Sequence, residues 1–482
     1  MHSHNLQPRQ QPEIHLLPIL IVDKTSAPTL SPLRKGLAEA TKRPQALANP
    51  FGIPPLRKPL ASRALAALLF FALVNVTWGM VGFGKLAPED FSYDTWTSCA
   101  ITDYLHGIKS APDVAFLGSS LVLFPSGGVD ADLMNKQIDG PRHHSSLYFE
   151  RKFQERTGQK ISTFNFALPG EMPSDAYMIT RFILKDQRRP NVIVYGVGPR
   201  DFMDNLLPSP SATDPFHHLA RFGDYSTQID KISPEWQDRL NYELGRLSFP
   251  YGHKEDLVHA FERATAKIAN TELGKLPILI VPMKLRRKIL PDYRPGEVGV
   301  AECMFQPYVD RARPAFSDNL VEYRKRYKEL KWNTFLDQMD FLSRTIDIAK
   351  ERGTKFVLVS MPITELNRQL LSPTAQAAFK ETVHVLAANK GVTFIDLDGS
   401  NNYKLSDFED TVHLHSGGGR KMLSAIAESL AQSSDIRAAL SQNSAGNGKN
   451  QAQSPGVARK NEEAKAKAKS KNSLATRKES FL

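Results

Sequence analysis

Five short apolar segments, separated by longer helix-like stretches, constrain the fold of this chain more than any other feature. Each segment is rich in Val, Ile or Phe, as is typical of strands covered on both faces. The segments are residues 113–118, 161–167, 191–197, 355–360 and 392–397. Helical stretches are predicted at 145–157, 173–186, 373–389 and 418–432. This alternation predicts an α/β fold with one parallel, five-stranded sheet and right-handed crossovers.

One long stretch, residues 203–345, interrupts the alternation between the third and fourth strands. It contains several prolines, aromatic residues and amphipathic pieces such as 332–350. The apolar piece at 276–283 is too short to cross a membrane. We expect an insertion of mostly helical character that lies over or beside the functional site.

An uncharged apolar run near the N-terminus, residues 64–83, is about 20 residues long, enough to cross the ~30 Å hydrocarbon core as a helix. Basic residues precede the run, and Trp78 lies near its outer end. The alternatives are a buried globular helix and a cleaved secretory signal, although the run is long for a signal and begins far into the chain. The pattern predicts a single transmembrane helix with a cytoplasmic N-terminus and the larger part of the chain outside.

The two ends of the chain differ in composition from its middle. Residues 1–60 predict a disordered cytoplasmic segment, and residues 436–482 predict a disordered basic tail. Much of the formal charge of +11 lies in these ends, and no nucleic-acid motif is present, so we predict no nucleic-acid partner. Residues 100–435 remain for one large domain outside the membrane. The two cysteines, Cys99 and Cys303, exclude a disulfide framework and a cysteine-rich zinc site, and leave their own pairing open.

Three residues have the chemistry of a serine-dependent acyl-group enzyme. Ser120 follows the first predicted strand, and a serine hydroxyl becomes a good nucleophile only when a base takes its proton. Asp410 and His413 are three residues apart, so one helical turn places a carboxylate beside an imidazole that it can orient. The alternatives are a serine that caps the first helix, a turn aspartate and a partly buried histidine at a helix start.

Two segments resemble the first and last sequence blocks of the SGNH (GDSL-type) hydrolases. The segment DVAFLGSSLV resembles the Gly-Asp-Ser-Leu block, with Ser119 at the aspartate position and Ser120 at the nucleophile position. The segment DTVHLHSGGG resembles the Asp-x-x-His block, in which Asp410, His413 and Gly418 match position by position. The resemblance implies a triad of Ser120, His413 and Asp410.

Two further segments resemble the middle blocks of the same family. In TFNFALPGEMPSD, Gly170 matches the glycine whose amide belongs to the oxyanion hole, and a tight-turn glycine is a compatible alternative. In VIVYGVGPRDF, Asp201 matches the aspartate of Gly-x-Asn-Asp, and Arg200 stands where the asparagine is expected. Arg200 supplies charge in place of that asparagine, binds an anionic substrate, or pairs with a nearby acid in a structural role.

The single anchor and the Gly-Ser-Ser turn are similar to those of SGNH proteins of D-alanyl transfer to teichoic acids and of alginate O-acetylation. The resemblance implies a three-layer, flavodoxin-like fold and an esterase or O-acyltransferase that modifies a cell-envelope polysaccharide without a cofactor. It also implies a multi-span acyltransferase partner in the inner or plasma membrane. The alternative is a non-catalytic SGNH-like module that binds glycan or scaffolds an envelope complex.

The remaining histidines give weaker signals. His415 forms a His-x-His pair with His413, but two histidines and one carboxylate do not complete a metal site, and we predict none. We expect His415 on the substrate side or at the surface. The pairs at 143–144 and 217–218 are predicted to lie in solvated loops.

Overall fold

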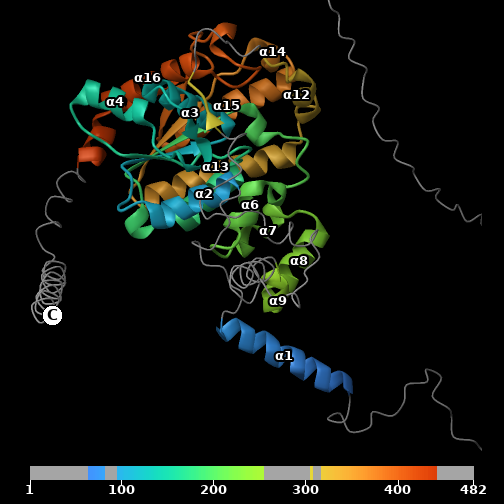
Figure 1. The fold of residues 1–482 in the computed structure, drawn as a ribbon. Helices are drawn as coiled ribbons and strands as arrows, with labels where there is room; N and C mark the ends of the chain where they lie inside the picture. Colours follow the sequence, from blue (N-terminus) through green and yellow to red (C-terminus); the bar gives the residue numbers. More distant parts are fainter. Residues whose placement is uncertain (1–62, 82–94, 255–303, 308–315, 442–482) are drawn as a thin grey trace, which may run out of the picture. The chain divides into compact units, whose positions relative to one another are not determined.

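The computed structural model describes residues 63–81, 95–254, 304–307 and 316–441 (Figure 1). The predicted disordered segment at 1–60 lies outside the described residues. So do most of the basic tail and Cys303, and with Cys303 the question of its pairing with the buried Cys99.

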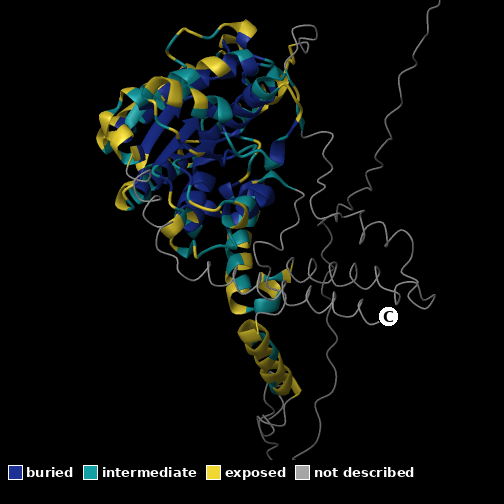
Figure 2. Ribbon diagram, turned by 60° about the vertical axis from the view of Figure 1, so that its left-hand side comes forward, coloured by how far each residue is buried: buried dark blue, intermediate teal, exposed yellow. Residues whose placement is uncertain are grey.

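The apolar run forms one helix, α1, over Arg63–Val81. Its mean hydropathy is 2.1, and none of its residues is buried (Figure 2). Nineteen residues span about 28 Å at the rise of an α-helix, close to the ~30 Å hydrocarbon core. By length and composition α1 is therefore able to cross a membrane.

The predicted parallel sheet is confirmed. Its spatial order is β3-β1-β4-β6-β7, and all neighbours are parallel. Its strands are β1 (Val114–Gly118), β3 (Thr163–Asn165), β4 (Val192–Val197), β6 (Lys355–Ser360) and β7 (Thr393–Asp396). Every residue of β1 and β4 is buried, which explains why these segments have no polar face.

Helices cover both faces of the sheet because the direction of winding reverses after β3. The chain moves from β1 outward to β3 and then back past β1 to β4, β6 and β7. Right-handed crossovers in opposite directions place their helices on opposite faces. Helix α16 packs on α3 and α4, and α13 packs on α5 and α15 (Figure 1). The bounds are α3 (Ser120–Met134), α4 (Leu147–Thr157), α5 (Pro173–Met178), α13 (Trp332–Glu351), α15 (Pro373–Lys390) and α16 (Ser416–Gln432).

The helix predicted over 173–186 is shorter than expected. After α5 the chain makes one π-helical turn, Ile179–Ile183, in which the Leu184 N–H bonds to the Ile179 carbonyl. The guanidinium of Arg352 donates to carbonyls at this end, among them that of Leu184 at 2.9 Å. The carbonyl groups at the end of a helix have no partner within the helix. Here Arg352, which is distant in the sequence, supplies that partner where the helix ends.

The described part of the insertion is mostly helical. Its strand β5 (Met304–Phe305) pairs antiparallel with β2 (Ile138–Asp139). The predicted boundary at 345 is too late, because α13 begins at Trp332 and is the regular crossover helix between β4 and β6. The α-helices in the described part of the insertion are α6 (Asp214–Leu219), α7 (Ile229–Ile232), α8 (Trp236–Leu247), α9 (Phe249–Gly252) and α12 (Leu320–Arg326).

The two ends of the domain also extend beyond the sheet. Helix α2 (Trp96–Thr102) precedes β1 and is almost wholly buried. At the other end residues 434–441 are helical, and both Ile436 and Leu440 are buried. The tail boundary predicted at 436 is therefore too early, because these apolar side chains belong to the core.

Two glycines allow α3 to start directly above the sheet. Gly118 and Gly196 are register partners on β1 and β4. A Cβ on Gly118, where φ is +142°, would lie 2.7 Å from the Gly196 carbonyl oxygen and 2.7 Å from a Val122 methyl. A Cβ on Gly196 would lie 2.4 Å from the same methyl. The missing side chains leave the space that the first turn of α3 occupies.

Replacing Gly118 tests this close approach. We expect Gly118→Ala to lower the free energy of unfolding by about 3 kcal/mol, since it adds both backbone strain and a clash. Gly158→Ala is the matched control, because Gly158 has φ +74° but an added Cβ would meet nothing within 4 Å. The control should cost about 1 kcal/mol. Urea unfolding of the full chain in detergent measures both, and equal losses would contradict the clash.

Candidate active site

All the predicted site residues lie at the carboxyl edge of the sheet. Ser120 is the first residue of α3, directly after β1, and Gly170 lies in the loop after β3. Asp201 belongs to a 3-10 turn after β4, and Asp410 and His413 lie between β7 and α16. Ligands of open parallel sheets bind at this edge, so the topology gathers residues that are distant in sequence.

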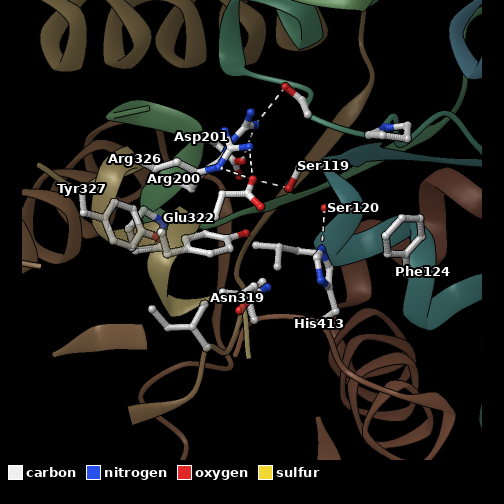
Figure 3. A pocket seen from close by; sticks show the side chains of 17 residues that line it. Ser119, Ser120, Phe124, Arg200, Asp201, Asn319, Glu322, Arg326, Tyr327 and His413 are labelled. Carbon is white, nitrogen blue, oxygen red and sulfur yellow. Dashed lines mark hydrogen bonds and ion pairs between the residues drawn. The ribbon is translucent and has the colours of Figure 1, made fainter. Parts of the chain in front are cut away.

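Ser120, His413 and Asp410 form one continuous hydrogen-bonded chain, of which Figure 3 shows the bond between Ser120 and His413. The Ser120 Oγ lies 2.8 Å from Nε2 of His413, and Nδ1 of the same ring lies 2.6 Å from Oδ2 of Asp410. The side chains of His413 and Asp410 are each 14% exposed. The imidazole is therefore held between a carboxylate and a hydroxyl, and it remains accessible from one side.

Local hydrogen bonds hold Asp410 in this orientation. Its Oδ1 accepts from the N–H groups of Val412 and His413 at 2.8 and 2.7 Å. Burial favours the neutral carboxyl, but the bonds to the His413 ring and to these two N–H groups keep the pKa of Asp410 below its ordinary value. An ionised Asp410 accepts the Nδ1–H of His413 and leaves Nε2 free to accept from Ser120.

The two serines at the start of α3 have different environments. Ser119, not Ser120, is the N-cap residue, and its Oγ lies 3.4 Å from Oδ2 of Asp201. The alternative that Ser120 caps the helix is therefore wrong, since its side chain contacts His413. One turn further on, the Phe124 ring packs against the imidazole with centroids 5.1 Å apart. The imidazole of His413 thus contacts the Ser120 hydroxyl and the apolar ring of Phe124.

Gly170 makes a turn that requires a glycine. Its φ is +77°, and its carbonyl oxygen accepts from Nη1 of Arg200 at 2.9 Å. Within the described residues its N–H makes no hydrogen bond. The N–H of Ser120, in the first turn of α3, likewise has no intrahelical acceptor. Two backbone donors are therefore available beside the Ser120 hydroxyl.

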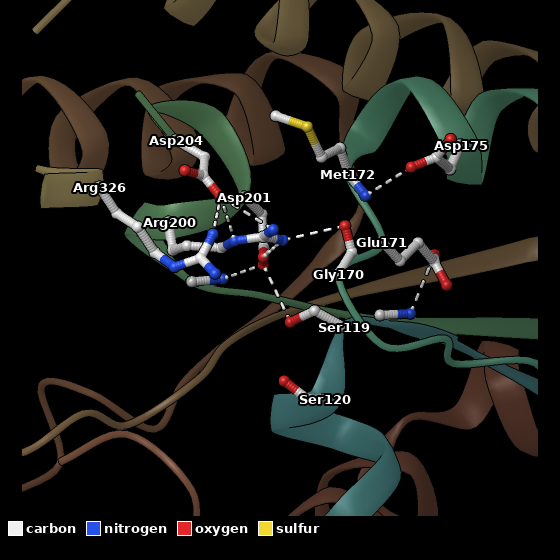
Figure 4. Close-up of polar contacts among 12 residues, drawn as sticks. Ser119, Ser120, Gly170, Glu171, Met172, Asp175, Arg200, Asp201, Asp204 and Arg326 are labelled. Atoms are coloured by element: carbon white, nitrogen blue, oxygen red, sulfur yellow. Dashed lines mark hydrogen bonds and ion pairs between the residues drawn. The ribbon is translucent and has the colours of Figure 1, made fainter. Parts of the chain in front are cut away.

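Arg200 and Asp201 form their hydrogen bonds with the loops around Ser120 (Figure 4). Arg200 bridges the Gly170 carbonyl to Asp204, whose Oδ2 lies 2.9 Å from the guanidinium and also pairs with Arg326. Asp201 is buried and accepts from the Gly198 N–H at 2.9 Å. Arg200 thus pairs with a nearby acid, which is the structural role that the sequence allowed for it. Its side chain also lines the pocket.

A pocket of about 240 Å³ opens at Ser120. Part of its wall comes from the insertion, which sequence reasoning placed over or beside the site without naming residues. No motif or spacing distinguishes these residues in the sequence. The insertion residues that line it are Asn319, Glu322, Tyr323, Arg326 and Tyr327 (Figure 3).

Asn319 links the insertion to the loop of Asp410 and His413. Its Oδ1 accepts from the N–H and the hydroxyl of Thr411, and the Thr411 hydroxyl in turn accepts from the buried amide of Asn367 at 3.0 Å. The Ser317 N–H also donates to the Glu409 carbonyl at 2.9 Å. Because the N–H of Thr411 can only donate, it must face the amide oxygen of Asn319. The amide nitrogen of Asn319 therefore points away from Thr411. The insertion thus fixes the loop that carries the base.

Three buried acids, Glu171, Asp175 and Asp201, lie near Ser120, and only Asp201 was among the predicted site residues. Glu171 accepts from the N–H groups of Gly118 and Leu168, and Asp175 accepts from the Met172 N–H. Burial, reinforced by neighbouring carboxylates, raises the pKa of Glu171 well above its ordinary value. Burial raises the pKa of Asp175 to about 7 and that of Asp201 to about 6. Glu171 and Asp175 thus satisfy backbone donors of the turn before Ser120 and of the Gly170 loop, and Asp201 satisfies one in the loop after β4.

The other histidine pairs noted in the sequence, and His415, have structural partners. The ring of His415 accepts from the Gly417 N–H and bonds to the Ser406 carbonyl, so it caps α16. His143 lies 2.8 Å from the buried Asp130, and His144 stacks on Phe164, so the prediction of a solvated pair at 143–144 is wrong. The pair at 217–218 lies in α6, where the His218 ring contacts Thr95. Among the described residues no group of three or more His, Cys, Asp or Glu side chains is placed to hold a metal ion.

No protein-family model matches this sequence, and no curated protein matches it.

The buried acids predict how stability depends on pH. Because Asp175 and Asp201 hold their protons more tightly in the folded state, their stabilisation is complete below about pH 4 and is lost as the pH rises through about 6 and 7. We expect the thermal midpoint of the full chain in detergent to fall between pH 5 and pH 8. In Asp175→Asn the thermal midpoint should fall less between pH 5 and pH 8 than in the wild-type chain. This holds even if the substitution also changes the midpoint at pH 5. An unchanged slope would contradict the assignment to Asp175.

Proposed function

We propose that this protein is a membrane-anchored, serine-dependent ester hydrolase or O-acyltransferase with the triad Ser120, His413 and Asp410. The observation that carries the proposal is the unbroken hydrogen-bonded chain from the Ser120 hydroxyl through His413 to an ionised Asp410. Nucleophile, base and orienting carboxylate are the three parts that serine-dependent acyl transfer requires. Ser120 lies near the start of the domain, and His413 and Asp410 lie near its end. Their contact therefore depends on the whole fold and not on one local turn.

The geometry supports a two-step acyl transfer. Ser120 Oγ attacks the acyl carbonyl while His413 Nε2 takes its proton, and Asp410 stabilises the imidazolium. The N–H groups of Ser120 and Gly170 donate to the developing oxyanion, each worth about 3 kcal/mol. His413 then returns the proton to the leaving alkoxide. In the second step water or a sugar hydroxyl attacks the acyl-serine while His413 takes its proton; the bond from the acyl carbon to Ser120 Oγ breaks, and His413 returns the proton to Ser120.

We also propose that the catalytic domain has the SGNH hydrolase fold. This assignment is supported by the four sequence blocks, each of which follows a strand, and by the order of the sheet, which in chain order reads 2-1-3-4-5 as in flavodoxin-like folds. Arg200 stands in place of the family's asparagine and is engaged with Asp204 and Gly170. We therefore assign two oxyanion donors and give Arg200 the role of positioning the Gly170 loop.

The substrate and location follow from the resemblance and from α1. We propose that α1 crosses the inner or plasma membrane, with a cytoplasmic N-terminus and the catalytic domain on the outer side. The substrate is then a cell-envelope polysaccharide, and a multi-span acyltransferase delivers the acyl group. No cofactor is needed for this chemistry.

Labelling by a fluorophosphonate probe tests the nucleophile. We expect labelling of the wild-type chain, none of Ser120→Ala, and a rate at least about 100-fold lower in His413→Ala, because the base is removed. Ser119→Ala is the matched control, since the Ser119 side chain faces Asp201, and it should be labelled. Labelling of Ser120→Ala at the wild-type level would contradict the proposal. A wild-type chain that is not labelled would favour the non-catalytic glycan-binding or scaffolding alternative.

Asn319 should contribute to the rate through the position of His413. We expect Asn319→Ala to lower kcat for p-nitrophenyl acetate about fivefold, the equivalent of one hydrogen bond of about 1 kcal/mol, with little change in KM. Asn402→Ala, on an exposed loop, is the control. A change confined to KM, or none, would contradict a positioning role.

A further inference from the structure

A second cavity lies beside the Ser120 pocket. Its volume is about 320 Å³, and Ile363 lines both cavities. The loop after β6, the short helix α14 (Glu365–Arg368) and the loop after β7 form its walls. It therefore lies at the same carboxyl edge of the sheet as Ser120, in the size range of small-molecule sites. The two cavities thus share the Ile363 side chain as a common wall.

Several polar groups that line this cavity have no protein partner. Oδ1 of Asp398 accepts from the Ile363 N–H at 3.2 Å and from Arg368 at 2.6 Å, which holds the carboxylate in place. In the part of the chain that the structure describes, no hydrogen bond or ion pair engages Oδ2 of Asp398, the Tyr403 hydroxyl or the Lys404 ammonium. The cavity thus offers both donors and acceptors.

Apolar side chains at the same cavity remain exposed. Leu366 and Leu405 are 41% and 53% exposed, and the Tyr403 ring packs against the core with its edge accessible. A sugar ring combines hydroxyl groups with apolar C–H faces, and so needs both kinds of surface. A purely hydrophilic or purely apolar ligand would leave one of the two unused.

The charges around the cavity balance. Arg368 pairs with Asp398 and Glu365, and with Lys404 the formal charges of these lining residues sum to zero. A polyanion such as a polyphosphate would find no excess of positive charge there. The balance favours a neutral ligand.

We propose that this cavity binds a neutral sugar ring of the polysaccharide, next to the unit that is acylated or deacylated at Ser120. The inference rests on the proposed function, which it extends from a single reacting group to a polymer at least two units long. It gives Tyr403 and Lys404 the role of substrate-binding residues, and it gives Ile363 the position between two sugar subsites.

Isothermal titration of the full chain in detergent tests the cavity. The probes are cellotetraose, xylotetraose and chitotetraose, with the corresponding monosaccharides. We expect at least one tetrasaccharide to bind about tenfold or more tightly than its monosaccharide. Lys404→Ala and Tyr403→Phe should each weaken that binding about fivefold, the loss of one hydrogen bond. Lys380→Ala, an exposed lysine on α15, is the control and should bind as the wild type does.

Two results would overturn the proposal: no tetrasaccharide binds the wild-type chain, or Lys404→Ala and Tyr403→Phe, shown to be folded by their thermal midpoints, bind with unchanged affinity. Fluorophosphonate labelling of the same wild-type preparation separates this failure from that of the proposed function. Labelling at Ser120 without glycan binding removes only the sugar subsite. Glycan binding without labelling removes the triad and leaves the subsite in place.

Discussion

The close contact between β1 and β4 at Gly118 and Gly196 is the constraint on which the site depends. With no side chain at either position, the first turn of α3 rests directly on the neighbouring strand, and Val122 fills the space. Ser120 consequently stands at the edge of the sheet, where the loops after β3, β4 and β7 converge. A larger residue at either glycine would lift α3 and move the serine away from His413.

The loops around Ser120 are held by charge and hydrogen bonds more than by apolar packing. Glu171 accepts the N–H of Gly118, just before Ser120, and Asp201 accepts the N–H of Gly198 after β4. Arg200 ties the Gly170 loop to Asp204. Buried carboxyls with raised pKa values destabilise a fold once they ionise, so this arrangement exchanges some stability for fixed backbone amides. Fixed amides are what an oxyanion requires.

The positions of the strands could be predicted from the sequence, because buried parallel strands are continuous apolar runs. The pairing of Asp410 with His413 could also be predicted, because residues three apart are close in the chain. The sequence was insufficient where distant segments meet. Nothing in the sequence near Arg352 indicates that its guanidinium ends a helix at Leu184. Likewise, nothing around Asn319 indicates contact with Thr411, since that contact depends on the path of the insertion. Glu171 was within a recognised block, but its burial depends on packing that no local pattern reveals.

The hydrogen bond between Ser120 and His413 joins residues 293 positions apart in the chain. Contacts of such long separation form late in folding, because the loop entropy must be lost before the contact is gained. The loop of His413 follows β7, which is one of the two edge strands of this sheet and the last of its five strands to be synthesised. A chain that is still being synthesised therefore contains Ser120 without an imidazole beside it. Its serine remains an ordinary hydroxyl until the last strand has docked.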